Sequence, residues 1–289
     1  MKKVLLTTSA LTLIAGAAAA DISLSGTGRI GVISTGGTTA VTHRLRINFT
    51  GSGQTDGGLT FGFFSRVQLL GGVATTSRAA PRLWIGNGTA TLTVGNAGGA
   101  VATAGNIWGC AVGFTGACAD MPNPNFTWVS NSSGGAGASV IRVDFSLGSA
   151  KVSLSGGNAS GGAANDTEVA ATFNLGAAKV GVSYDNGATT TGGTQVHVGF
   201  NAGSANIGVH YARNNSGITG TTATVSYAMG PGKLYVAAGK SINAAGTASQ
   251  NTVALSYGGS LGGGASWAVS YRKVGTAAAT TDAGVKFKF

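Results

Sequence analysis

The segment Arg44-Leu45-Arg46-Ile47-Asn48-Phe49-Thr50 alternates without a break between polar and apolar side chains. Successive side chains of a β-strand point to opposite faces, so the three apolar residues share one face and the four polar residues share the other. A strand of this kind separates an apolar environment from water. Other parts of the chain repeat the pattern, which indicates strands with one continuous apolar face.

The same alternation recurs along the chain, for example in residues 59–66, 151–155, 179–184 and 266–272. Between such segments, seven short turns alternate with eight longer connections, of which the first lies at residues 35–43. Seven turns and eight connections join sixteen strands, although the strand boundaries also allow fourteen or eighteen.

The continuous apolar face distinguishes a membrane barrel from a soluble sandwich. Strands of about nine residues match the span of an outer membrane. No segment after residue 20 has eighteen consecutive apolar residues, so the sequence predicts no membrane-spanning helix there. Closure into a barrel removes the unpaired strand edges that lipid does not tolerate. We therefore expect an all-β fold, a transmembrane antiparallel β-barrel with most simply 16 strands.

Composition and the first residues indicate an exported, β-rich chain. The 289 residues include 51 glycines, 43% are hydrophobic and only 9% are charged, which differs from an ordinary soluble domain. Residues 1–20 combine Lys2 and Lys3, an apolar core and a small-residue cleavage site, as a secretory signal peptide does. The apolar core is too short for a membrane anchor. We expect a signal peptide at residues 1–20 and a barrel at residues 21–289.

Several signals of other functions are weak. Without Lys2 and Lys3, 16 basic and 8 acidic residues remain, but they form no basic runs, so nucleic acid is not an expected partner. The glycine motif at residues 26–31 lies inside a strand pattern rather than before a helix. His43, His197 and His210 are scattered without acidic partners, and the chain has no nucleophile elbow. We expect no enzyme activity, no metal and no cofactor.

Residues 96–137 interrupt the strand pattern. They hold the two cysteines of the chain, Cys110 and Cys118, and a single acid, Asp120. In an exported protein, two cysteines at this spacing favour a disulfide over a metal site or a catalytic thiol. A connection of this length without secondary structure is usually either functional or a sign that the fold has been assigned wrongly.

Four segments resemble one known family. Residues 22–29, 44–48 and 55–62 resemble the opening strands of the general-diffusion porins of alphaproteobacteria, and residues 285–289 resemble the terminal strand of outer-membrane barrels, which ends on phenylalanine. The resemblance implies a homotrimer of sixteen-stranded barrels in the bacterial outer membrane. It also implies that the outer-membrane assembly machinery reads the terminal strand with Phe289.

The resemblance further implies that the third loop, residues 96–137, folds inward as a constriction opposite a ladder of arginines. The first four strands place five arginines where this ladder would lie: Arg29, Arg44, Arg46, Arg66 and Arg82. The constriction loop of the family is usually acidic, whereas this loop contains only Asp120. We therefore expect a steric restriction rather than a charged counter-wall.

Assignment of strand residues to faces predicts a basic lumen. Three acids face inward, namely Asp144, Glu168 and Asp282, against twelve bases, which leaves a net charge of +9. The outward face carries almost no charge, as lipid requires. A lumen of one sign enriches counter-ions, which favours anions here. The inward bases are Arg29, Arg44, Arg46, Arg66, Arg82, Arg142, Lys151, Lys179, Lys233, Arg272, Lys286 and Lys288.

The sequence thus favours a passive outer-membrane channel for small hydrophilic solutes and ions, with a preference for anions. The alternative is a Gly-rich outer-membrane or secreted β-rich adhesin, an interaction protein without a pore. An adhesin would suit longer exposed loops, and a β-solenoid would show a short internal repeat, which is not found.

Overall fold

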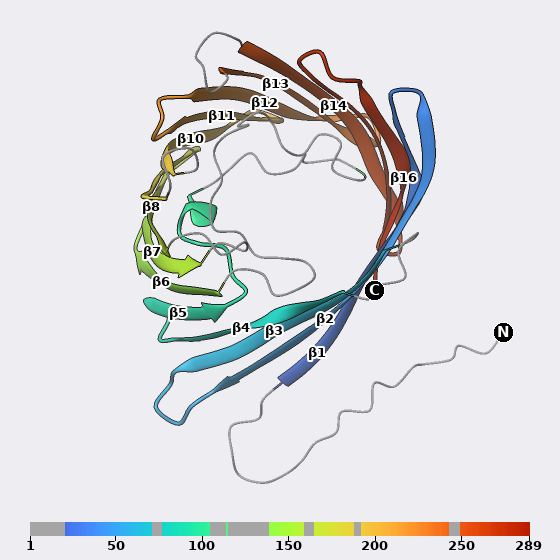
Figure 1. Cartoon of the computed structure of the whole chain (residues 1–289). Coiled ribbons are helices and arrows are strands. Elements are labelled where there is room, and N and C mark those ends of the chain that lie inside the picture. Colours follow the sequence, from blue (N-terminus) through green and yellow to red (C-terminus); the bar gives the residue numbers. More distant parts are fainter. Residues whose placement is uncertain are drawn as a thin grey trace, which may run out of the picture.

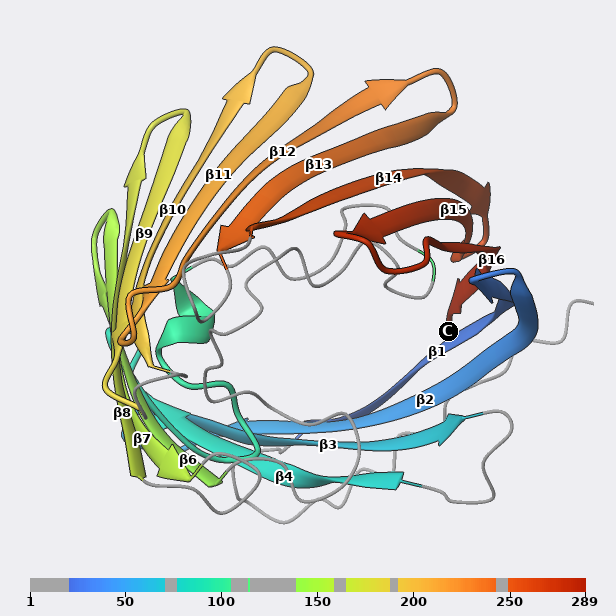
Figure 2. The ribbon, with the colours of Figure 1, turned by 45° about the horizontal axis from the view of Figure 1, so that its top comes forward.

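The chain forms a closed antiparallel barrel in which every strand pairs with its sequence neighbours and β1 pairs with β16 (Figures 1 and 2). The computed structural model describes residues 21–70, 77–104, 114, 139–158, 165–187, 192–242 and 249–289. Sixteen strands lie in these residues, which confirms the predicted fold class and strand number.

The strands of the first half are β1 (Asp21–Thr35), β2 (Thr38–Gln54), β3 (Thr60–Leu70), β4 (Ser77–Gly86), β5 (Ala90–Gly95), β6 (Ser139–Leu147), β7 (Ala150–Asn158) and β8 (Asn165–Leu175). Those of the second half are β9 (Ala178–Asp185), β10 (Gly193–Ala202), β11 (Ala205–Asn214), β12 (Thr219–Met229), β13 (Gly232–Ile242), β14 (Ser249–Gly262), β15 (Ala265–Val274) and β16 (Thr280–Lys288). One short 3-10 helix, η1 (Val101–Thr103), follows β5 and lies inside the ring of strands (Figure 1). The part of the chain that the structure describes contains no helix with the length and hydropathy of a membrane span.

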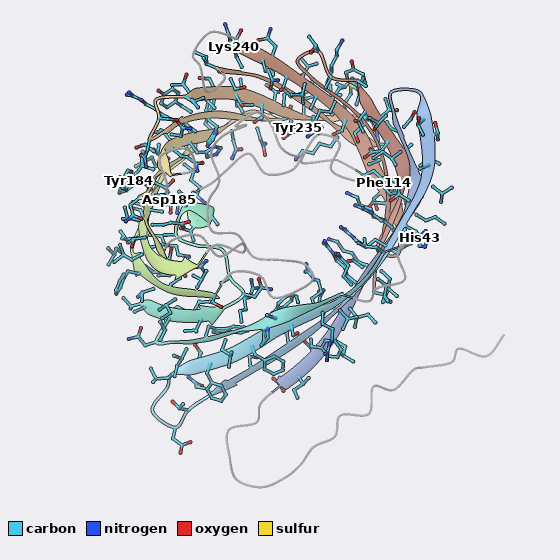
Figure 3. All side chains as sticks on the ribbon, viewed as in Figure 1. His43, Phe114, Tyr184, Asp185, Tyr235 and Lys240 are labelled. Carbon is cyan, nitrogen blue, oxygen red and sulfur yellow. The ribbon has the colours of Figure 1, made fainter. Side chains whose placement is uncertain are left out.

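The apolar face of the strands points outward, as the alternation predicts. Leu83, Val94 and Leu154 are 55%, 41% and 47% exposed. The residues that alternate with them along each strand point into the barrel. Figure 3 shows Tyr184 outside the ribbon and its neighbour Asp185 inside it. Exposed aromatic residues lie near both ends of the strands, where the interfaces of a membrane barrel carry girdles of aromatic side chains. One girdle includes Tyr184 and Tyr211, and the other includes Phe49, Phe173, Phe200, Tyr227 and Phe289.

The barrel closes where its two ends meet. Residues of β1 from Thr27 to Thr35 pair with β16. Beyond β16, Phe289 donates its backbone N–H to the Gly26 carbonyl and accepts the Gly26 N–H. The Phe289 ring lies against Gly26, where a Cβ would collide with it. The terminal residue therefore extends the closing strand pair.

One predicted connection is wrong. Residues 35–43 were expected to form the first longer connection, but Thr38 pairs with Thr35 and the ladder continues from there. The turn contains only Gly36 and Gly37, whose φ angles are +60° and +85°. Two consecutive residues with positive φ form the tight hairpin turn that matches the twist of paired strands. The polar, threonine-rich composition of residues 38–43 concealed this extension.

Candidate functional site

Three basic side chains form a row across the closing strands. Arg29 on β1 lies directly opposite Lys286 on β16 and directly opposite Arg44 on β2. All three point into the lumen. Like charges at directly opposite positions destabilise a sheet, by about 0.2–1 kcal/mol for each pair. The row therefore creates a strong local field rather than stability.

The next arginines are held by neutral side chains. Arg46 donates its Nε–H to Oε1 of Gln68 at 2.6 Å, and Arg66 donates its Nε–H to Oδ1 of Asn48 at 2.7 Å. A neutral acceptor fixes the direction of a guanidinium without removing its charge. These two contacts set the orientation of both guanidinium groups.

Phe64 is an inward aromatic residue among these arginines. The guanidinium carbons of Arg66 and Arg82 lie 5.2 Å and 4.7 Å from the centre of its ring, which is the geometry of cation–π contacts. Sequence alternation placed Phe64 on the inward face but gave it no role. We name the inward faces of β16 and β1–β4 the basic wall.

Arg142 on β6 differs from the other predicted pore-lining arginines. Its Nη2 lies 3.1 Å from Oδ2 of Asp144, and its Nη1 donates to the Gly98 carbonyl at 2.6 Å. Asp144 also accepts a hydrogen bond from Ser153 and lies 3.8 Å from Nζ of Lys151. Arg142 is therefore a structural residue that joins β6 to the start of the third loop.

The start of the third loop is also bound to β7 and β8. Glu168 on β8 is fully buried, and its carboxylate accepts the Val101 N–H at 2.8 Å and the Ser155 hydroxyl at 3.3 Å. The Ala100 N–H donates to the same hydroxyl at 2.7 Å. The carboxylate of Glu168, which was predicted to face the lumen, is therefore engaged in binding η1.

Small residues allow the close approach of η1 to the wall. Ala100 and Ala104 pack on Ala170 of β8, whereas Val101 packs on Ala212 of β11. The Ala104 carbonyl lies so close to Gly181 of β9 that a Cβ there would collide with it. Glycine is required by this contact. We name the inward faces of β8–β15 the small-residue wall.

Phe114 reaches the basic wall instead. Its ring is 1% exposed and lies against Gly31 of β1 and Gly284 of β16, which are directly paired. The Arg29 guanidinium carbon lies 5.9 Å from the ring centre. Figure 3 shows Phe114 inside the barrel near the closing strands. Among its described residues, the third loop therefore contacts both walls.

The remaining site residues have mixed outcomes. Cys110, Cys118 and Asp120 lie outside the described residues, as do residues 1–20. Asp185, which was not among the predicted inward acids, is the last residue of β9 and is 1% exposed, and its carboxylate accepts the Gly187 N–H at 2.7 Å. The prediction of lumen acids therefore missed one.

Two of the three histidines, which lie on separate strands, form a direct cross-strand pair. The rings of His197 and His210 have centroids 6.4 Å apart, and Nε2 of His210 lies 2.8 Å from Oε1 of Gln195. A sequence signal existed, because His197 lies six residues before Gly203 and His210 six residues after Ser204, the two residues of the turn. In the described part of the chain, no group of three or more His, Cys, Asp or Glu could hold a metal ion.

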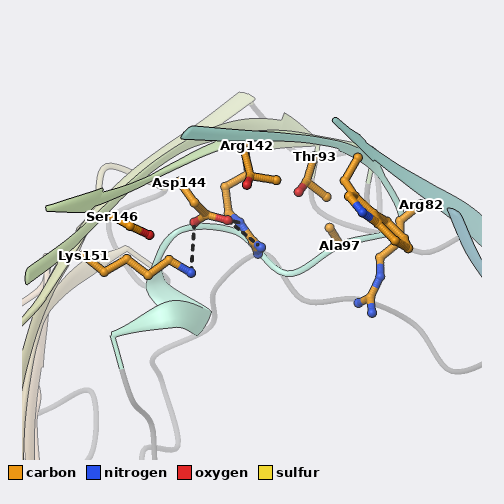
Figure 4. A pocket seen from close by; sticks show the side chains of 9 residues that line it. Arg82, Thr93, Ala97, Arg142, Asp144, Ser146 and Lys151 are labelled. Carbon is orange, nitrogen blue, oxygen red and sulfur yellow. Dashed lines mark hydrogen bonds and ion pairs between the residues drawn. The ribbon is translucent and has the colours of Figure 1, made fainter. Parts of the chain in front are cut away.

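A cavity of about 400 Å³ lies between the wall and the start of the third loop (Figure 4). It combines three cationic side chains, one carboxylate, an indole and several hydroxyls. Its lining residues are Arg82, Trp84, Thr91, Thr93, Ala97, Arg142, Asp144, Ser146 and Lys151.

Comparison with solved structures shows the same fold in porin variants from Rhodopseudomonas blastica. A fivefold mutant of that porin is 22% identical, covers 93% of this chain and 100% of its own, and superimposes with a TM-score of 0.79. A triple mutant is 21% identical with the same coverage and a TM-score of 0.77. No curated protein matches the chain.

The family model described as Gram-negative porin matches residues 7–279, which is most of the chain. This match agrees with the closed sixteen-stranded barrel and with the resemblance seen in the opening and closing strands. It favours a channel over the alternative of an adhesin. The protein belongs to the Gram-negative porin family and is a passive diffusion channel of the outer membrane, not an enzyme.

Proposed function

We propose that this porin passes small hydrophilic solutes and prefers anions. The single observation that carries the preference is the row of Lys286, Arg29 and Arg44 on adjacent strands. Charges in a low-dielectric tube focus their field and raise the local concentration of counter-ions. Rings or rows of arginine and lysine favour anion passage.

The state of the lumen acids supports the proposal. The carboxylate of Asp144 is engaged by Arg142, and that of Glu168 is engaged by the start of the loop. Asp282 is 4% exposed and accepts a hydrogen bond from Ser270. Buried, hydrogen-bonded carboxylates are not available to a permeating cation, so the basic side chains dominate the field that a solute meets.

The remaining parts of the proposal follow from the resemblance and from the sequence. Residues 1–20 act as a cleaved signal peptide, residues 96–137 form the constriction, and Cys110 and Cys118 form a disulfide. The channel is a homotrimer, and the terminal strand with Phe289 directs assembly. Arg29, Arg44, Arg46, Arg66 and Arg82 line the constriction, together with Asp120, whereas Arg142 supports it.

Reconstitution in a planar bilayer under a KCl gradient tests the function. We expect large, water-filled channels and a reversal potential of the sign that chloride preference produces. A reversal potential of the opposite sign would overturn the anion preference, and the absence of channels would overturn solute diffusion. Migration of the unheated protein on a gel as a monomer would contradict the trimer.

A further inference from the structure

The cavity beside Ala97 contains two cationic side chains, Lys151 and Arg82, that are not neutralised by a close ion pair within the described part of the chain. Arg142 and Asp144 form an ion pair at 3.1 Å, and dashed lines in Figure 4 mark the contacts of Asp144 with Arg142 and with Lys151. Lys151, whose side chain is 43% exposed, reaches Asp144 only at 3.8 Å. Arg82 makes no hydrogen bond or ion pair with the described part of the chain, and its guanidinium projects from the wall in Figure 4.

The surroundings of Arg82 favour a planar anion. The Phe64 ring lies 4.7 Å from its guanidinium carbon and supports one face of the group. Stacking on an aromatic ring leaves the N–H edge open, and that edge matches the two oxygens of a carboxylate. A guanidinium fixed in this way loses less conformational freedom when it binds.

An aromatic surface lies beside these cations. Trp84 is the next inward residue of β4, and its indole leans over Gly62 of β3, where a Cβ would collide with the ring. The missing side chain at Gly62 thus lets the indole lie along the wall. The hydroxyls of Thr91 and Ser146 complete the cavity lining. The cavity volume of about 400 Å³ falls in the range of small-molecule sites.

We propose that this cavity is a binding subsite for small aromatic carboxylates on their way through the channel. Arg82 binds the carboxylate, Lys151 adds a second positive charge, and Trp84 stacks with the ring. The proposal rests on the proposed anion-preferring function, because the same solutes must first enter the lumen. The subsite would recognise the aromatic ring of a solute in addition to its negative charge.

Titration calorimetry of the purified, detergent-solubilised protein tests the subsite with three probes: benzoate, acetate and benzamide. We expect benzoate to bind about two- to tenfold more tightly than acetate, because only benzoate offers a ring. We expect it to bind about ten- to a hundredfold more tightly than benzamide, which lacks the charge. Equal affinities for benzoate and acetate would overturn the proposal.

Variants locate the site. Trp84→Leu should reduce benzoate affinity to the level of acetate, and Arg82→Gln should reduce it about ten- to a hundredfold. Arg82→Lys keeps the charge without the fork and should give an intermediate loss. The matched controls are Trp267→Leu and Arg78→Gln, which change an outward tryptophan and an exposed arginine. Equal losses in the controls would place benzoate binding elsewhere and overturn the proposal.

The reversal potential separates the two proposals. A cation-selective wild-type channel would overturn the proposed function, whatever the titration shows. An anion-selective channel with no preference for benzoate over acetate would overturn the subsite alone. If Arg82→Gln fails to form folded barrels, Arg82→Lys and Trp84→Leu still decide the outcome.

Discussion

The basic wall and the small-residue wall face each other across one lumen but are built on opposite principles. The basic wall presents long cationic side chains in adjacent rows, such as Arg29 beside Arg44 and Lys286. The small-residue wall presents many alanine, serine and threonine side chains and fewer charged ones, which include Lys179, Lys233 and Arg272. Ala170, Ala212 and Ala254 are each 1–2% exposed. One wall generates a field, and the other provides a close-packed surface.

The difference explains how a loop can lie inside a charged channel. η1 packs on the small-residue wall through alanine contacts, a glycine contact and the buried carboxylate of Glu168. On the basic wall, Asn96 at the start of the loop donates hydrogen bonds to the backbone carbonyls of Ala80 and Pro81. Further along the loop, Phe114 occupies the notch left by Gly31 and Gly284. The small-residue wall therefore supports the loop, whereas the basic wall supplies most of the electric field in the lumen. Substitutions on the two walls should have different effects.

The largest effect is expected from Phe114→Ala. Truncation of a buried phenylalanine typically costs about 3–5 kcal/mol, and here the loss falls on the contact between the loop and the basic wall. We expect the loop to leave the notch and the single-channel conductance to rise, with more current noise. Planar-bilayer recordings at symmetric KCl measure both quantities.

Phe173→Ala is the matched control, because Phe173 is 39% exposed on the outward face. It removes the same side chain without touching the loop, so its conductance should equal that of the wild type. Unchanged conductance and noise in Phe114→Ala would show that the notch does not hold the loop.

A smaller effect is expected from Gly181→Ala on the small-residue wall. The added Cβ would collide with the backbone carbonyl of Ala104, which cannot move away as a flexible side chain can. Overpacking of this kind typically costs about 1–3 kcal/mol. We expect the loop start to shift and the temperature of heat modification on gels to fall.

Gly199→Ala on the neighbouring strand is the control for this substitution. A Cβ at Gly199 would lie 3.3 Å from the His197 side chain, which can adjust, and 3.9 Å from the Ile207 carbonyl. The control should therefore unfold at nearly the wild-type temperature. A fall of equal size in both variants would mean that glycine matters for the strands and not for the loop contact.

Much of this architecture could be predicted because membrane strands have a strict period of two. The alternation in residues 44–50 placed Arg44 and Arg46 inward, and the structure agrees. The position of the first connection was predicted wrongly at residues 35–43, where the strands continue to a two-glycine turn. Local pattern determines the face of a residue but not the end of a strand.

The contacts across the lumen could not be predicted, because they join residues far apart in the chain. Nothing near Phe114 in the sequence indicates Gly31 and Gly284, and nothing near Glu168 indicates the N–H of Val101. The pairing of His197 with His210 is different, since it follows from equal distances to one turn. Strand register is thus readable from sequence where a hairpin is short, whereas the seating of a long loop depends on tertiary packing.

The smallest effect on stability, and the one that best separates the walls, is expected from Arg44→Gln. Arg44 lies directly opposite Arg29, and relief of a like-charge pair should leave the barrel unchanged or stabilise it by up to about 1 kcal/mol. The same change removes one cation from the row, so the ratio of chloride to potassium permeability should fall.

Arg213→Gln, at an exposed outward position on β11, is the control and should leave the ratio unchanged. Heat modification and reversal potential are measured on the same preparations. A loss of stability without a change in reversal potential would mean that Arg44 supports the fold, and the division of roles between the two walls would then be wrong.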